Sequence, residues 1–260
     1  MVILIAESKT MLNTERIISQ NEIKTSTPCF EEIAEEIVES LKDMTVGELA
    51  KELKLSSTLA AKMQKMIYEF PYKSTGNQAI ESYTGVVFKA LDFASLSPDA
   101  KNQCVKQLRI ISSLYGWLNP LDIIKPYRLD FTIKLEEGPS AGKTLNAFWK
   151  MNVTKALVNM LNNCNEREII NLLPADASKC VDWKLVKRFA KVWKIDFQEI
   201  SDGGEMKTPK AEKLKSLRGS LVRQILLEGL SSASDLKQIS GDKYVCEGTP
   251  IYVDHFRFLC

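Results

Sequence analysis

Apolar positions in the first third of the chain recur mostly with helical spacing. Residues 2–6 (VILIA) are the exception, because an unbroken apolar run of this length predicts a buried strand. From Phe30 to Leu41 apolar residues return every three or four positions between glutamates, which predicts an amphipathic helix. Thr27 and Pro28 are expected to cap this helix and to occupy its first turn.

Two further helices are predicted before residue 70. Thr45 and Glu48 have the spacing of a capping box, in which each side chain accepts a hydrogen bond from the other residue's backbone. Ser56 or Ser57 opens the next helix. Apart from its first strand, the N-terminal third is therefore expected to be helical.

Short apolar runs and alternating segments replace this pattern after about residue 80. They predict strands over 108–112, 131–135, 168–173, 189–199, 243–246 and 253–258. Helices are predicted over 98–104, 146–161 and 209–228, and 86–93 fits either element. Because strands and helices interleave without an internal repeat, we expect one compact α/β domain over 1–260, with a mixed sheet flanked by helices.

The composition fits a globular chain with a full core, since 45% of its 260 residues are hydrophobic. No stretch reaches the about 20 apolar residues of a membrane helix, so no membrane partner is expected. The first residues show neither the basic segment nor the cleavage site of a signal peptide. A cytoplasmic protein with reduced thiols is therefore expected.

The chain contains six cysteines but no C-x-x-C pair, and His255 is its single histidine. These counts argue against clustered zinc sites and against H-E-x-x-H zinc hydrolysis. His255 fits a strand residue better than a catalytic base. No cofactor or metal site is evident, and the pattern does not reveal the oligomeric state.

Charge is distributed unevenly, although the net charge is only +2. Residues 179–224 contain twelve Lys and Arg against six Asp and Glu. Such a segment fits a surface that faces a polyanion, and it fits a solvated lysine-rich helix equally well.

Residues 112–131 (SSLYGWLNPLDIIKPYRLDF) are apolar but repeatedly interrupted by Gly, Pro and charged residues. The breaks predict a strand, a turn, a second turn or short helix, and an extended segment around the second proline. This order brings Tyr115, Asp122, Tyr127 and Arg128 together near a strand end, where loops often hold functional residues.

Arg218 lies on the apolar side of the last long predicted helix, about 40° from Leu214 on a helical wheel. A guanidinium facing the protein body must be paired or must open into a cleft. Gly219 follows it and permits a close approach of backbone or ligand. Two interpretations stay open: a buried ion pair with an acid such as Asp122 or Asp130, or a ligand-binding arginine.

Two loops contain residue types that bind anions. Lys9 and Thr10 follow the first strand, and ligands of α/β sheets gather at the carboxyl ends of strands; a turn with a solvated lysine is the simpler alternative. The sequence GPSAGKT at 138–144 is similar to a phosphate-binding loop, but its glycines are one residue too close and Pro139 removes an N–H. We interpret it as a surface loop.

Several motifs together resemble the YaaA family. LYGWLNPLD at 114–122 and KPYRLD at 125–130 resemble its central signature, L-Y-G-x-L-R-P-L-D followed by P-Y-R-L-E. IAESKT at 5–10 resembles S-P-A-K-T, and Phe148-Trp149 resembles Q-F-W. Residues 170–172 resemble I-N-L-A-S, and Lys215–Gly219 resembles K-x-A-R-G. The matches follow one another in the family's order and span nearly the whole chain.

The resemblance implies a bacterial cytosolic protein of the hydrogen peroxide response, which limits unincorporated iron and so limits damage to DNA. It also implies a compact single α/β fold with a positively charged cleft, a helix-hairpin-helix-like element and DNA binding.

The chain departs from the family pattern at several polar positions. Glu7 follows Ala6 where the family has Ser-Pro, which puts a carboxylate beside Lys9. F-K-G-D-V-Y and S-x-E-Y-x-K are also altered, and an Arg is replaced; these departures fall at Thr84, Val86, Asn119, Pro174 and Ala177. A diverged member with a changed or lost activity is therefore an alternative.

We expect the cleft to bind DNA or another phosphate-bearing ligand, because the planar guanidinium of Arg donates two parallel hydrogen bonds to phosphate. Tyr115 and Trp149 are expected to offer stacking faces to bases. The alternatives are an enzyme acting on a nucleotide or small phosphorylated substrate, and a scaffold with buried ion pairs. The expected cleft residues are Lys9, Thr10, Tyr115, Asp122, Tyr127, Arg128, Trp149, Lys179, Lys215 and Arg218.

Overall fold

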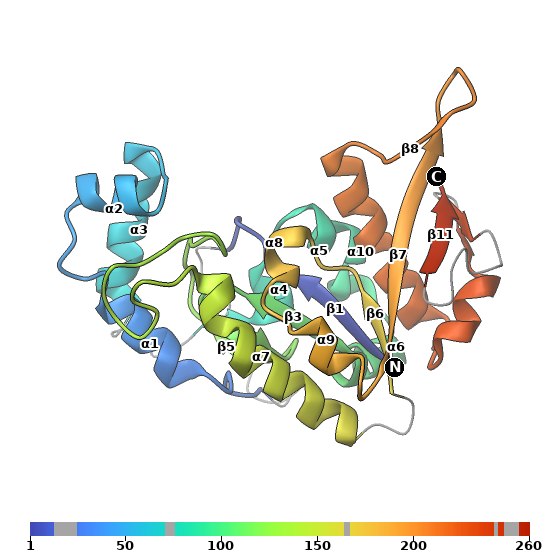
Figure 1. Cartoon of the computed structure of the whole chain (residues 1–260), viewed down its shortest axis with the longest axis horizontal. Helices are drawn as coiled ribbons and strands as arrows, with labels where there is room; N and C mark the ends of the chain where they lie inside the picture. Colours follow the sequence, from blue (N-terminus) through green and yellow to red (C-terminus); the bar gives the residue numbers. More distant parts are fainter. Residues whose placement is uncertain (13–24, 71–75, 164–166, 242–243, 247–254) are drawn as a thin grey trace.

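A computed structural model describes residues 1–12, 25–70, 76–163, 167–241, 244–246 and 255–260 (Figure 1). Its strands are β1 (Val2–Ala6), β2 (Asn77–Gln78), β3 (Leu108–Ser112), β4 (Gly116–Leu118), β5 (Ile123–Ile124), β6 (Glu168–Asn171), β7 (Lys191–Ile200), β8 (Met206–Lys207), β9 (Ser240–Gly241), β10 (Tyr244–Cys246) and β11 (His255–Leu259). Its α-helices are α1 (Glu31–Glu39), α2 (Val46–Glu52), α3 (Ser57–Glu69), α4 (Ala79–Ser82), α5 (Val86–Leu91), α6 (Pro98–Gln107), α7 (Leu145–Asn162), α8 (Ala175–Ser178), α9 (Trp183–Val186) and α10 (Ala211–Leu227).

The main sheet has the strand order β4-β3-β1-β6-β7-β11-β10-β9, and β8 extends it as a hairpin partner of β7. The central strands β3, β1, β6, β7 and β11 are parallel to their neighbours in this series. All five residues of β1 are buried, as expected for a parallel strand covered on both faces. Figure 1 shows α7 and α9 in front of the sheet, and α5, α6 and α10 lie behind it.

The chain changes direction across the sheet on either side of β1. It runs from β1 to β3 on one side and then returns to β6 on the other side of β1. In open α/β sheets such a reversal opens a crevice at the carboxyl ends of the two strands, which is where ligands bind. The topology therefore marks the loops after Ala6 and Asn171 as the place for a site.

Helices α1 to α3 form a helical lobe at one side of the molecule (Figure 1). The predicted capping box is confirmed, because Thr45 and Glu48 exchange both hydrogen bonds at the start of α2. Ser56 caps α3, as predicted. The predicted start of α1 is wrong, because the helix begins at Glu31 and Phe30 occupies its cap without a side-chain hydrogen bond.

Of the two elements predicted for 86–93, the structure has the helix, since α5 covers Val86–Leu91. Two further element predictions need correction. Residues 131–135 are not a strand, although their burial alternates, because the segment forms a turn and a single bridge from Lys134 to Thr144. Helix α10 begins at Ala211, two residues after the predicted start. The predicted strand positions 243 and 253–254 lie outside the described residues.

The interrupted run at 112–131 contains short strands and turns but no helix. After β3 the chain reverses into β4, which pairs antiparallel with β3 through Ser112 and Gly116. Gly116 has φ +68°, and a Cβ atom there would lie 2.5 Å from the Trp149 ring. Trp149 Nε1 donates to the Ser113 carbonyl at 2.8 Å. The glycine therefore allows the turn to pack directly on the indole.

One hydrophobic cluster runs from the sheet into the helical lobe, and it includes both Ile5 of β1 and Ile67 of α3. The mixed α/β fold is confirmed, and the parallel strands fix the direction in which their following loops emerge.

Candidate functional site

A cavity of about 460 Å³ lies at the carboxyl ends of β1 and β6, at the reversal point of the sheet. Its wall comes from the β1 end and the following loop, the start of α5, the extended segment after Tyr127, the loop after β6, and helix α10. The lining residues that bear charge are Glu7, Lys9, Asp130, Asp176, Lys215 and Arg218.

Glu7 is the first residue after β1 and is partly buried in the cavity wall. Its Oε2 accepts a hydrogen bond from the Ser113 N–H at 2.9 Å and another from the Tyr127 hydroxyl. Within the described part of the chain it forms no ion pair with Lys or Arg. Burial raises the pKa of Glu7 to about 7, and these hydrogen bonds oppose that rise only in part.

Beneath Glu7 the buried hydroxyl groups form a connected network. Tyr127 Oη lies 2.7 Å from Tyr83 Oη and 2.7 Å from Ser112 Oγ. Burial raises the pKa of both tyrosines, so their hydroxyls stay protonated. The network anchors Glu7 to β3 and to the segment before α5.

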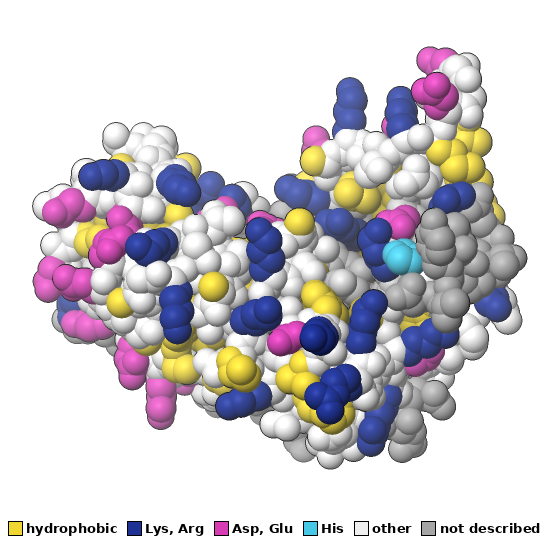
Figure 2. Space-filling view, viewed as in Figure 1, with side chains coloured by type: hydrophobic (Ala, Val, Ile, Leu, Met, Phe, Trp, Pro, Cys, Tyr) yellow, Lys and Arg dark blue, Asp and Glu magenta, His cyan; other side chains and the backbone are white. Residues whose placement is uncertain are grey.

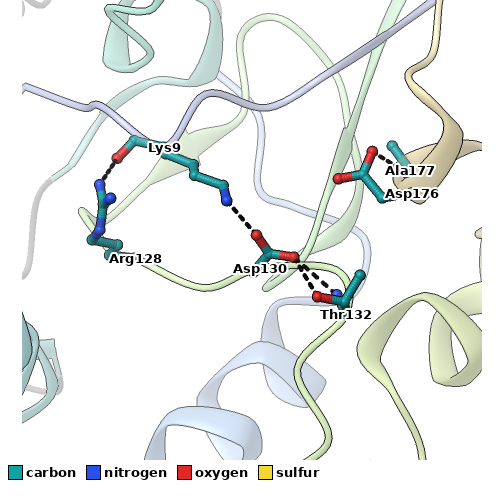
Figure 3. Close-up of polar contacts among 6 residues, drawn as sticks. All are labelled: Lys9, Arg128, Asp130, Thr132, Asp176 and Ala177. Atoms are coloured by element: carbon teal, nitrogen blue, oxygen red, sulfur yellow. Dashed lines mark hydrogen bonds and ion pairs between the residues drawn. The ribbon is translucent and has the colours of Figure 1, made fainter. Parts of the chain in front are cut away.

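Lys9 is held in place by two interactions (Figure 3). Its ammonium group pairs with Asp130, and its carbonyl oxygen accepts a hydrogen bond from Arg128 Nη1 at 2.7 Å. Burial alone would raise the pKa of Asp130, but hydrogen bonds from Lys9 and Thr132 outweigh burial and hold that pKa below its usual range. Lys9 therefore enters the cavity already matched by a carboxylate.

Lys215 and Arg218 extend from α10 to the cavity without a carboxylate within ion-pair distance among the residues described. Desolvation lowers the pKa of Arg218, and Asp176 partly opposes this; a guanidinium nevertheless stays charged in proteins. The interpretation of Arg218 as paired with Asp122 or Asp130 is wrong, because Asp122 bonds Ser26 and Asn119 and Asp130 pairs with Lys9.

Gly219 sets the distance between α10 and α5. A Cβ atom at this position would collide with the Val87 carbonyl oxygen and would lie 2.9 Å from Ala90 Cβ. The absent side chain lets α10 pack directly on α5, as the sequence predicted, and so places Lys215 and Arg218 over the cavity.

The cavity has mixed charge, whereas a mainly basic cleft was expected. Three cations face three acids, and Asp130 already pairs with Lys9. Figure 3 shows Asp176 on a separate element from the Lys9–Asp130 pair. Net positive charge in the cavity therefore depends on Lys215, on Arg218 and on whether Glu7 is ionised.

The structure brings together some of the predicted cleft residues and separates others. Lys9, Thr10, Lys215 and Arg218 line the cavity, and Arg128 touches its wall through Lys9. Tyr127 lies below the wall as a partner of Glu7. Lys179 is exposed and is not part of the lining.

The predicted stacking role of Tyr115 and Trp149 is wrong, because their exposed fractions are 1% and 0%. Tyr115 instead accepts the Lys125 N–H at 3.1 Å. Asp122 is likewise enclosed, and its two oxygens accept hydrogen bonds from Ser26 and from the Asn119 backbone. Tyr115, Asp122 and Trp149 therefore stabilise the fold and do not line the cavity.

Sequence reasoning missed Glu7 and Asp176 as cavity residues. In the sequence Glu7 is a departure from the family pattern, and Asp176 stands at the Glu position of the altered S-x-E-Y-x-K motif. Val86, another departure, also lines the cavity. The position directly after a buried strand was the available signal, because side chains there emerge at the carboxyl edge of the sheet.

Within the described ranges, no group of three or more His, Cys, Asp and Glu side chains is arranged to hold a metal ion. In the same part of the chain, no helix combines the length and the hydropathy needed to cross a bilayer.

Comparison with known proteins identifies the family. Residues 1–249 match the family model described as "Peroxide stress protein YaaA". The chain belongs to the YaaA family. A UPF0246 protein of Parabacteroides distasonis is 30% identical over 264 residues, covering 100% of this chain and 99% of that protein. UPF0246 proteins of Rickettsia bellii and Clostridium perfringens are 31% and 30% identical, and each comparison covers 94% of this chain.

The surface around the YaaA-family cavity is uneven in charge. On the face shown in Figure 2, Lys and Arg side chains spread over the middle and the right of the molecule, whereas many acidic side chains gather at its left edge. The molecule is hollowed between the helical lobe and the side that bears the β7–β8 hairpin (Figure 2).

Proposed function

We propose that this chain acts in the cytosolic peroxide stress response by binding a small phosphate-bearing ligand, of about the size of a nucleotide, in the cavity. The observation that supports this most directly is the pair of cations on α10. Lys215 and Arg218 line the cavity and have no carboxylate within ion-pair distance in the described part of the chain. A phosphate would supply the missing negative charge, and Arg218 could bind it with two parallel hydrogen bonds.

The size and position of the cavity favour a small ligand. Its volume of about 460 Å³ lies in the range of small-molecule sites, about 300–1,000 Å³. It also lies where the strand order reverses, which is the usual ligand position in an open α/β sheet.

DNA is the second candidate ligand, and the spread of Lys and Arg over one face favours it (Figure 2). In that case a backbone phosphate would reach the cavity mouth while the surrounding cations hold its neighbours. We include a role in limiting free iron and damage to DNA only because the chain belongs to this family.

Isothermal titration calorimetry with a nucleoside monophosphate and with a short DNA duplex tests these two candidates. We expect saturable binding of the nucleotide, and we expect Arg218→Met to weaken it by about tenfold or more, because a buried charge-assisted contact is lost. Arg223→Met is the matched control, since Arg223 lies on the same helix but donates to the carbonyls of Leu91 and Asp92.

The salt dependence separates the two ligands. Affinity for DNA should fall steeply with salt, because several phosphates release counterions, whereas affinity for one phosphate group should fall far less. Nucleotide binding that is absent, or equal in Arg218→Met and the parent, would contradict the small-ligand proposal. Phosphorus NMR of the same samples would show whether the ligand is converted, which decides between a binding protein and an enzyme.

A further inference from the structure

Glu7 is the carboxyl group in the cavity wall that the ligand-binding proposal leaves unexplained. It lines the same cavity as three cations yet pairs with none of them within the described residues, and it is partly buried. A carboxylate in this position would repel a phosphate that approaches Lys215 and Arg218. The charge state of Glu7 should therefore affect the affinity of the cavity for a phosphate.

The hydrogen bonds around Glu7 indicate which of its oxygens is available for a proton. Ser112 Oγ accepts from the Leu114 and Tyr115 N–H groups, at 3.2 and 2.9 Å, so its own proton is available to Tyr127. The Tyr127 hydroxyl then donates to Glu7 Oε2, which also accepts the Ser113 N–H. Because Oε2 already accepts two hydrogen bonds, we assign an added proton to Oε1.

The buried titratable groups near Glu7 stay neutral. Tyr127 donates to Glu7, Tyr83 and Cys180 are close enough to feel its charge, and burial raises the pKa of all three. Across the cavity Lys9 and Asp130 form a pair, while Asp176, Lys215 and Arg218 complete the charged lining. With Glu7 ionised the lining has equal numbers of positive and negative groups, and with Glu7 neutral it has one positive charge in excess.

We propose that the cavity takes up its phosphate-bearing ligand together with one proton, which Glu7 Oε1 holds and donates as a hydrogen bond to a ligand oxygen. The inference rests on the proposed function and adds a residue that selects for anionic acceptors. The proton comes from solvent, and no covalent bond forms or breaks. The raised pKa of Glu7, about 7, supports this coupling because little free energy is needed to protonate it at neutral pH.

Sulfate is the probe for the test, because it stays fully ionised over the pH range used. Its affinity is measured by calorimetry between about pH 6 and about pH 9 for the parent, Glu7→Gln and Glu32→Gln. Gln mimics the protonated carboxyl, since its amide stays neutral and can donate where Oε1 would. Glu32 is exposed on α1, away from the cavity, so its variant controls for loss of one negative charge.

For the parent and Glu32→Gln we expect sulfate affinity to fall by up to about tenfold for each pH unit above the pKa of Glu7. Glu7→Gln should bind with an affinity that does not change over this range. Titrations of the parent in two buffers of different ionisation enthalpy should show uptake of about one proton per sulfate at the alkaline end. This last measurement needs no variant and decides the matter even if Glu7→Gln fails to fold.

Binding of sulfate by the parent with no pH dependence and no proton uptake would overturn the inference and leave the proposed function standing. Failure of sulfate and of the nucleoside monophosphate to bind at any pH would instead overturn the proposed function.

Discussion

The run at 112–131 and the Lys215–Gly219 segment of α10 both resemble family motifs, and both reach the same cavity, but their polar groups behave differently. In the run, Asp122 and Tyr127 are enclosed and bonded to neighbours in the protein. On α10, Lys215 and Arg218 face the cavity without an ion-pair partner in the described part of the chain. The polar groups named in the run are bonded within the protein, whereas the two cations of α10 face the cavity.

This difference shows that a motif can persist in a sequence for packing reasons as well as for binding. The Gly116–Trp149 contact and the tyrosine network need particular residues because a tight core has no spare volume. The α10 cations need no such fit, and the proposed ligand would account for their position beside a cavity. Substitutions in the closed run should therefore reduce stability, and those on α10 should reduce affinity.

The largest expected effect on stability is that of Gly116→Ala. The new Cβ atom would meet the Trp149 ring at 2.5 Å, and alanine is strained at φ +68°. Together these should lower the free energy of unfolding by about 4 kcal/mol. Gly142→Ala is the matched control, because Gly142 has φ +72° but nothing within 4 Å of its added Cβ, so it should lose about 1 kcal/mol. Equal losses in urea denaturation would refute the packing role of Gly116.

Glu7 should make stability depend on pH in the direction opposite to most acids. The folded protein keeps the Glu7 proton up to about pH 7, whereas the unfolded chain loses it near the ordinary glutamate pKa of 4.5. The unfolded state thus binds fewer protons between these values, so stability should fall as pH rises from about 4.5 to about 7, by up to about 3 kcal/mol.

Denaturant unfolding of the parent and Glu7→Gln at both ends of this range checks whether stability falls as pH rises. The difference between the two proteins should grow in favour of Glu7→Gln as pH rises. A constant difference would show that Glu7 titrates normally.

Tyr127→Phe should lower the free energy of unfolding by about 2 kcal/mol, because it removes the buried hydrogen bonds that the Tyr127 hydroxyl forms with Tyr83, Ser112 and Glu7. Tyr68→Phe, at a side chain that is 50% exposed, should change stability by less than about 0.5 kcal/mol. Thermal unfolding of the two variants side by side gives the comparison, and similar values would place Tyr127 outside the closed network.

The smallest expected effect on stability is that of Arg218→Met, within about 0.5 kcal/mol, since no ion pair is lost and a desolvated charge is removed. Arg223→Met should lower the free energy of unfolding by about 1.5 kcal/mol, because the Arg223 guanidinium donates to two carbonyls at 3.0 and 2.9 Å. A loss for Arg218→Met as large as that for Arg223→Met would mean that the α10 cations also serve the fold.

Prediction from the sequence succeeded where the governing contacts are local. The capping box at Thr45 and Glu48 involves residues three positions apart, and the apolar run of β1 follows from burial on both faces. It failed at 131–135, where alternating burial arises without a strand partner along the segment. It also failed for Tyr115 and Trp149, because aromatic residues near a loop can equally fill a core.

The sequence by itself determined most of the helices and strands, the resemblance to the family, and the cations of the first strand's loop and the last long helix. Only the tertiary structure decided which polar groups are hydrogen-bonded or ion-paired within the protein and which face the cavity. Glu7 meets Tyr127 across 120 positions of sequence, and Arg218 faces a cavity because Gly219 lets α10 rest on α5. Such pairings depend on how distant segments pack, and local periodicity contains no information about that packing.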